Sequence, residues 1–137
     1  MTASHAGAIA AAEPLTLRIY GLSPLIEAGV VATCATLDAE ALHSARSPGE
    51  YEQIRADRRH AYEHLATEDR HWQMAFDAQR ALARTGRHPA VGIADLLTAA
   101  LASEHQVTVV HYDADFDLAG EIMTFKRQWA APRGSLP

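Results

Sequence analysis

The sequence has a single cysteine, Cys34, among its 137 residues. An internal disulfide is therefore excluded, and so is a zinc site built on thiolates. The thiol stands in the run Val-Val-Ala-Thr-Cys-Ala, which predicts a buried strand where a lone cysteine acts as a small, inert hydrophobe. A reducing, cytoplasmic compartment fits this composition.

Long apolar runs are also absent. No stretch approaches the roughly 20 apolar residues that a membrane-spanning helix needs. The alanine-rich start lacks the basic residues of a signal peptide. We therefore expect a soluble protein without a membrane partner.

A surplus of positive charge is missing too, because the formal net charge is −5 at pH 7. Counterion release from nucleic acid requires a positive surface, so broad, nonspecific binding is disfavoured. Any RNA would have to meet a local basic patch, although a solvated charged face is the alternative for each residue. The candidates for such a patch are Arg46, Arg55, Arg58, Arg59, Lys126, Arg127 and Arg133.

The chain does contain enough apolar material for one compact domain over residues 1–137, since 48% of its residues are hydrophobic. Alternating strand and helix patterns predict an α/β fold with a parallel sheet covered on both faces. Thr36 or Asp38 is expected to cap the first long helix, and Trp72 and Phe76 are expected in the core. The expected elements are strands at 30–34 and 107–112, helices at 39–46, 50–64, 68–84, 93–104 and 118–125, and a loop at 113–116.

The amino-terminal part has weaker patterns. Ser4 to Ala12 is a weak candidate helix, because it is rich in alanine but offers little to bury. Leu15 to Tyr20 alternates with the period of a strand. Pro24 to Ala28 predicts a short helical turn.

Acidic residues follow the predicted strands. Glu40 lies one turn into the first long helix, Asp95 starts the helix at 93–104, and Asp113 and Asp115 end the strand at 107–112. Ligands bind outside the carboxyl ends of the strands in an open parallel sheet, so these acids can converge there. Converging carboxylates repel unless a cation such as Mg²⁺ or Mn²⁺ neutralises them. Such a site would predict phosphodiester cleavage by a metal-activated water.

Each acid also has an ordinary structural explanation. Asp95 would serve as a helix N-cap, Glu40 as a solvated helix residue, and Asp113 and Asp115 as turn formers. His111 lies near the expected pocket, but we expect it to hydrogen-bond within the loop rather than act as a general acid.

Several blocks of the sequence form a distinctive set. One is Gly-Ile-Ala-Asp-Leu-Leu-Thr-Ala-Ala (92–100), followed by Val-Thr-Val-Val-His-Tyr-Asp-Ala-Asp-Phe-Asp (107–117). Others are Pro-Leu-Ile-Glu-Ala-Gly-Val-Val-Ala-Thr-Cys (24–34), Ala-Glu-Ala-Leu-His-Ser-Ala-Arg (39–46), Tyr-Glu-Gln-Ile-Arg (51–55) and the tail from Trp129 to Leu136. Together these blocks resemble actinobacterial VapC toxins. The family-like region is therefore 24–136, and 1–23 is atypical.

The resemblance implies a PIN-like, three-layer α/β/α fold around a central, mainly parallel sheet. It implies a metal-dependent endoribonuclease whose acidic pocket is normally formed by four carboxylates. Matched to this sequence, Glu40 falls on the second, Asp95 on the third and Asp113 on the fourth, with Asp115 beside it. The implied cofactor is Mg²⁺ or Mn²⁺, and the implied partners are RNA, a small cognate antitoxin and a second copy in a homodimer.

The chain departs from the family at its start, where the family has an apolar strand ending in Asp. Residues 1–12 contain no acid, so the first strand is missing or altered. Two functions stay open: a working ribonuclease toxin, and a catalytically impaired protein that retains antitoxin binding only. An unrelated doubly wound regulatory domain would also place acids at strand ends, but it would not explain the block resemblance.

Overall fold

The computed structural model describes residues 8–11, 31–111 and 114–129. Five strands form one sheet in the order β3-β2-β1-β4-β5. The strands are β1 (Ala8–Ala11), β2 (Val31–Cys34), β3 (Glu63–Leu65), β4 (Val107–His111) and β5 (Lys126–Trp129). The helices are α2 (Ala35–His43), α3 (Pro48–Ala61), α4 (Asp69–Ala83), α5 (Ile93–His105) and α6 (Asp115–Ala119), with a 3₁₀ turn η2 (His88–Ala90).

The direction of β1 sets the sheet apart from a fully parallel one. β2 pairs in parallel with β3, and β4 pairs in parallel with β5, while β1 lies between β2 and β4 and is antiparallel to both. Four strands therefore share one direction and the central strand is reversed. Ala8 faces Val110, so the amino end of β1 lies beside the carboxyl end of β4.

The strand β1 contradicts the candidate helix at 4–12 and shows how the first strand is altered. Ala8–Ala11 is a strand and not part of a helix. Alanine favours helices, but a short alanine run cannot nucleate one alone, and pairing with two neighbouring strands satisfies its backbone. The altered first strand that the sequence predicts is thus a reversed one. The predictions for 15–20 and 24–28 lie outside the described residues.

The helix starts differ from the predicted ones. α2 begins at Ala35, directly after the extended residue Cys34, and no side chain caps it. The predicted caps Thr36 and Asp38 lie inside its first turn. The Ser-Pro-Gly break also starts the next helix, because the Ser47 hydroxyl accepts a hydrogen bond from the Glu50 amide at 3.0 Å.

The carboxyl ends of two predicted helices are also corrected. α3 ends at Ala61, and the next residues form the edge strand β3 instead of extending the helix to position 64. The predicted helix at 118–125 is replaced by α6, which starts at Asp115 and ends at Ala119, and by the turn that leads from α6 into β5. β5 is held to α6 by Asp117, which accepts hydrogen bonds from Arg127 Nε at 3.1 Å and Trp129 Nε1 at 3.0 Å.

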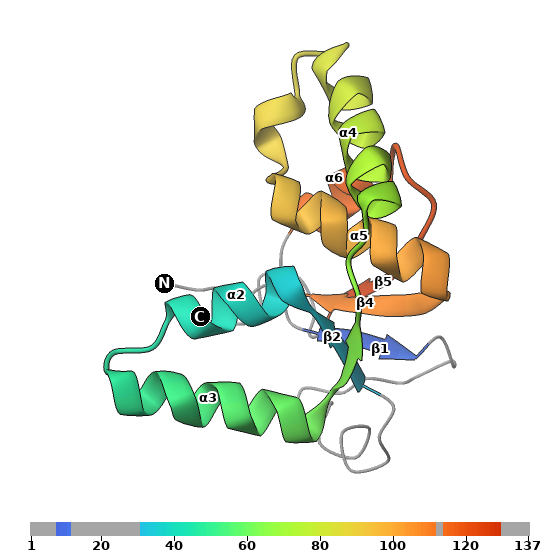
Figure 1. Ribbon diagram of the computed structural model, residues 1–137. Helices are drawn as coiled ribbons and strands as arrows, with labels where there is room; N and C mark the ends of the chain where they lie inside the picture. Colours follow the sequence, from blue (N-terminus) through green and yellow to red (C-terminus); the bar gives the residue numbers. More distant parts are fainter. Residues whose placement is uncertain (1–7, 12–30, 112–113, 130–137) are drawn as a thin grey trace.

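The core lies between the sheet and the helices α4, α5 and α6, which stack on one side of it (Figure 1). Every residue of α5 from Leu96 to Ala102 is buried, as its apolar sequence predicts. The side chains of Trp72 and Phe76 are not in the core, contrary to prediction: they are 40% and 48% exposed. The buried face of α4 consists of His71, Ala75, Ala78 and Leu82.

Candidate functional site

Glu40 lies on α2, the helix that follows β2 without a break. Thr36 lies one helical turn earlier and shares a face with Glu40, because residues four apart on a helix lie above one another. The Glu40 side chain is half-buried. The predicted residue therefore lies one turn from the carboxyl edge of the sheet.

Asp95 lies in the first turn of α5, and its side chain is also half-buried. The N-cap of α5 is Gly92, without a side-chain hydrogen bond, so Asp95 is not the cap that the structural alternative required. One turn further along is Thr98, whose side chain is buried.

The two helices are joined by hydroxyl groups. Thr36 Oγ1 and Thr98 Oγ1 are 2.9 Å apart, and Thr98 Oγ1 also donates to the Ala94 carbonyl oxygen at 3.0 Å. Figure 1 shows α2 and α5 running in opposite directions, and the two helices contact each other. Glu40 lies one turn after Thr36, and Asp95 lies about one turn before Thr98. Both acids are therefore displaced to the same side of the hydroxyl contact.

The remaining predicted ligands follow β4. Asp115 is the first residue of α6 and is half-buried, and α6 packs against α5. Asp113 lies outside the described residues. His111 ends β4, and its fully buried ring lies between Phe116 and Trp129, with centroids 5.1 and 4.9 Å away. A buried ring in such a packed position does not have the access that a general acid needs.

The sheet edge at which β2 and β4 end includes one strand of opposite direction. β2 and β4 end there, whereas β1 begins there at Ala8. β1 consists of Ala8, Ile9, Ala10 and Ala11, and none of these residues has a carboxylate. The described part of β1 therefore contributes no acid to this edge.

Asp117, two residues beyond Asp115, is tied to β5 instead of facing the acids. Burial would raise the pKa of Asp117, but hydrogen bonds from Trp129 and Arg127 outweigh it and leave that pKa below its usual value. Gly120 lets the Arg127 side chain pass close by, because a β-carbon on Gly120 would overlap the guanidinium group. Arg127 is thus committed to a structural contact.

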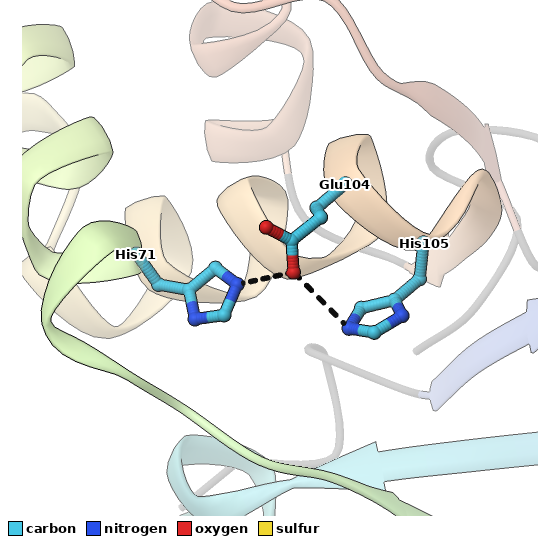
Figure 2. A group of neighbouring side chains, drawn as sticks. All are labelled: His71, Glu104 and His105. Atoms are coloured by element: carbon cyan, nitrogen blue, oxygen red, sulfur yellow. Dashed lines mark hydrogen bonds and ion pairs between the residues drawn. The ribbon is translucent and has the colours of Figure 1, made fainter.

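A second group of ionisable side chains lies between α4 and α5 (Figure 2). Glu104 Oε2 is 2.7 Å from His71 Nε2 and 3.5 Å from His105 Nε2. Arg70 also donates to both oxygens of Glu104, at 2.6 and 2.9 Å. Hydrogen bonds from Arg70 and His71 lower the pKa of Glu104 to about 2.

This second group has the spacing of metal ligands but the hydrogen bonding of a structural link. His71 Nδ1 accepts a hydrogen bond from the Glu68 amide at 2.9 Å, so Nε2 carries the proton and donates to Glu104. A metal on Nε2 would displace that proton, and the Arg70 guanidinium would repel the cation. We assign the group to the attachment of α4 to α5.

Sequence reasoning missed the polar side chains that position the acids. Thr36 and Thr98 carry no signal in the sequence, because a threonine pair on two helices is recognised only when the helices are seen in contact. Asp38 was expected as a cap, yet its Oδ1 accepts hydrogen bonds from Thr33 Oγ1 and Arg58 Nε, both at 2.8 Å. These two hydrogen bonds hold the side of α2 that lies opposite Glu40.

The fold and the acids at its strand ends have a counterpart among known families. Residues 10–122 match the family described as PIN domain. The match covers most of the chain, and the chain therefore belongs to the PIN-domain family. The predicted α/β, PIN-like fold is confirmed by it.

Three relatives narrow the class further, and all are from Mycobacterium tuberculosis. Ribonuclease VapC21 is 38% identical over 116 residues, which cover 85% of this chain and 84% of the relative. Ribonuclease VapC51 is 36% identical over 115 residues, 84% of this chain and 82% of the relative. Ribonuclease VapC18 is 31% identical over 113 residues, 81% of this chain and 82% of the relative. Within the PIN domains, this chain is a VapC-type protein, as the sequence blocks predicted.

Nothing among the described helices is both long and apolar enough to cross a bilayer.

Proposed function

We propose that this protein is a Mg²⁺- or Mn²⁺-dependent endoribonuclease, the toxin of a toxin–antitoxin pair, with Glu40, Asp95, Asp113 and Asp115 as its acidic pocket. The observation that carries the proposal is the contact between Thr36 and Thr98, which are 2.9 Å apart. It fixes two helices so that Glu40 and Asp95 extend to one side. The names of the relatives, each a ribonuclease, support the same activity.

The donor set fits a hard divalent cation. All four ligands are carboxylates, and Glu40, Asp95 and Asp115 are half-buried, where like charges repel more strongly than in water. Asp95 and Asp115 also lie at helix amino ends, which favour the charged carboxylate. A bound cation would neutralise the pocket and increase the acidity of a coordinated water. Glu40, Asp95, Asp113 and Asp115 would hold the cation, which would offset the repulsion between these carboxylates and the anionic phosphodiester.

A specific observation favours the alternative function, an impaired nuclease that only binds its antitoxin. The central strand β1 is antiparallel to both neighbours, so its carboxyl end lies at the far edge of the sheet. The first of the family's four acids therefore has no equivalent on the described part of β1. The alternative predicts a chain that folds and binds an antitoxin but holds metal weakly.

The proposed partners follow from the class. A small antitoxin with a segment that lies over the acidic pocket would explain how a cell tolerates the nuclease, and a homodimer and a cytoplasmic location belong to the same proposal. Sedimentation of the purified chain, alone and with the protein encoded beside it, would measure both assemblies. Sedimentation at the monomer mass alone would remove the homodimer from the proposal.

Cleavage of RNA by the purified protein tests the proposed activity. We expect cleavage with Mg²⁺ or Mn²⁺, loss of cleavage with EDTA and recovery when the metal is returned. Asp95→Asn should reduce the rate by more than the roughly 10- to 100-fold that outer-shell changes cost. Asp77→Asn is the matched control, because Asp77 is an exposed acid on α4.

Calorimetry separates the two functions. A chain that binds Mn²⁺ in the wild type and not in Asp95→Asn supports the nuclease. A chain that binds an antitoxin peptide but no metal, and cleaves no RNA, would replace the proposal by the binding-only alternative.

A further inference from the structure

A hollow of about 330 Å³ lies between α2 and α3, next to β2 and β3. Its walls include Asp38, Arg55, Arg58, Arg59, Tyr62 and His64. Three guanidinium groups against one carboxylate give it a formal charge of +2, in a chain whose formal net charge is −5. The hollow is therefore a local positive surface on an acidic protein.

The inner wall of the hollow is fixed by hydrogen bonds. Arg58 donates from Nε to Asp38 at 2.8 Å and from Nη2 to Thr33 Oγ1 at 2.9 Å. Its guanidinium carbon also lies 4.9 Å from the centroid of the Tyr62 ring. The Arg58 side chain is only 19% exposed. These contacts hold Arg58 in place and use much of its donor capacity.

The outer wall of the hollow carries guanidinium groups that are available to bind a ligand. Arg55 and Arg59 are one turn apart on α3 and are both exposed. Arg55 has a long ion pair with Glu52, at 3.9 Å, which water screens strongly. Within the described part of the chain, no ion pair involves Arg59. Two adjacent guanidinium groups on one helix face can hold a phosphate with several charge-assisted hydrogen bonds.

The hollow lies on the other side of α2 from the acidic pocket. Asp38 and Leu42 face the hollow, while Thr36 contacts α5 and Glu40 shares its face. One helix, about 10 Å across, separates the two regions. A strand of RNA that crosses α2 would therefore place one phosphate in the hollow and a nearby linkage at the acids.

We propose that this hollow binds a phosphate of the RNA substrate outside the linkage that is cleaved, with Arg55 and Arg59 as the contacting residues. The inference rests on the proposed function for the identity of the ligand. RNA is favoured over an acidic protein segment because the chain is acidic overall and needs a local positive surface to approach RNA. The residue that closes the inner wall, Arg58, has a positioning role.

Binding measurements with a fluorescein-labelled, single-stranded RNA of mixed sequence test the inference. The Asp95→Asn background prevents cleavage during the titration. Adding Arg55→Ala and Arg59→Ala should weaken binding by about tenfold or more. The slope of log affinity against log salt should also fall by about 0.7 for each lost phosphate contact. Circular dichroism of each variant confirms that the fold is retained.

A matched control is available on α4. Arg80 and Arg84 are exposed and have the same four-residue spacing, so Arg80→Ala with Arg84→Ala removes equal charge away from the hollow. This control should keep both the affinity and the salt slope within about twofold, since it removes no phosphate contact.

The outcomes separate this inference from the proposed function. Equal RNA affinity in the two double variants would overturn the inference, even if the wild type cleaves RNA. Loss of antitoxin binding with unchanged RNA binding would also overturn it and assign the hollow to a protein. If the wild type cleaves nothing but needs Arg55 and Arg59 to bind RNA, the hollow remains a site for an RNA phosphate, while the nuclease proposal falls together with the cleaved linkage.

Discussion

At the scale of single residues, the pair Thr36 and Thr98 decides where the two acids lie. Thr98→Val keeps the shape of the side chain but removes the hydroxyl that contacts Thr36 and Ala94. We expect a loss of about 1 kcal/mol in the free energy of unfolding, which urea denaturation measures. We also expect RNA cleavage to fall by about 10-fold, as for other outer-shell changes at metal sites.

A double-mutant cycle with Thr36→Val provides the control. If the two hydroxyls act as a pair, removing both should cost less than the sum of the single changes. Strictly additive effects would mean that the helices are held by packing alone, and that the hydroxyl contact does not position Glu40 and Asp95.

The Glu104 carboxylate makes a prediction about acid stability. Hydrogen bonds from Arg70 and His71 lower its pKa from the ordinary 4.5 to about 2, so the ionised form is favoured in the folded protein. The stability from this group is complete above the unfolded pKa and is lost as pH falls from about 4.5 towards 2. Wild type and Glu104→Gln should therefore differ most in stability near neutral pH and converge in acid, as thermal unfolding at a series of pH values would show. A constant difference at every pH would contradict the assignment, and Glu121→Gln is an exposed control in the turn after α6.

At the scale of elements, α4 shows why the face of a helix is hard to assign from sequence. Two stripes compete on it, one with Trp72 and Phe76 and one with Ala75 and Leu82. The aromatic stripe appears stronger by composition, but the small residues allow α4 to lie close to α5. His71 joins the buried stripe because Glu104, on the next helix, supplies a partner. The sequence does not reveal that partner.

Stability measurements distinguish the two faces of α4. Leu82→Ala should cost about 2–5 kcal/mol in the free energy of unfolding, because the side chain is fully buried. Trp72→Ala and Phe76→Ala should each cost about 1 kcal/mol or less, mainly from the contact between their rings. Larger losses at the aromatic positions would mean that this face is covered in solution, and sedimentation would then show by what.

Other elements were predictable for clear reasons. α5 was predicted well because nearly every residue in its middle is apolar. The buried face of the helix therefore did not have to be chosen. β2 was predicted well because its residues are small or β-branched and all buried, and β4 because it is β-branched from Val107 to Val110. β3 and β5 were not predicted, since both are short strands with polar residues whose backbone pairing depends on a neighbour.

At the scale of the whole molecule, the acidic pocket should couple metal binding to global stability. Mn²⁺ at about 100 times its dissociation constant would stabilise the folded chain by about 2.7 kcal/mol. For a domain of this size, that corresponds to a rise in Tm of roughly 10 °C. Differential scanning fluorimetry should show this rise in the wild type and not in Asp95→Asn.

The comparison variant for this measurement is Asp77→Asn, which removes an exposed acid on α4 that is not a proposed ligand, and it should keep the full rise. A rise that is equal in all three proteins would point to metal binding elsewhere. The group of His71, Glu104 and His105 would then be the first place to look, and the hydrogen bonding that we assign to it would need revision.

The candidate site was predicted from the sequence only in part. Glu40, Asp95, Asp113 and Asp115 were chosen because they follow predicted strands and because they match the acidic residues of the family, but neither signal reveals the contact between Thr36 and Thr98. The sequence supplied a list of candidate basic residues. It did not reveal that Arg55, Arg58 and Arg59 share one hollow, or that Arg127 pairs with Asp117. Such groupings depend on how helices approach each other, and no local pattern encodes that.

The reversed central strand has a practical consequence for anyone who handles this protein. Because β1 enters the sheet at Ala8, beside the carboxyl end of β4, a bulky group attached at that position would shield the proposed acidic pocket from large molecules. An inhibitory peptide attached there would act on its own chain at high local concentration.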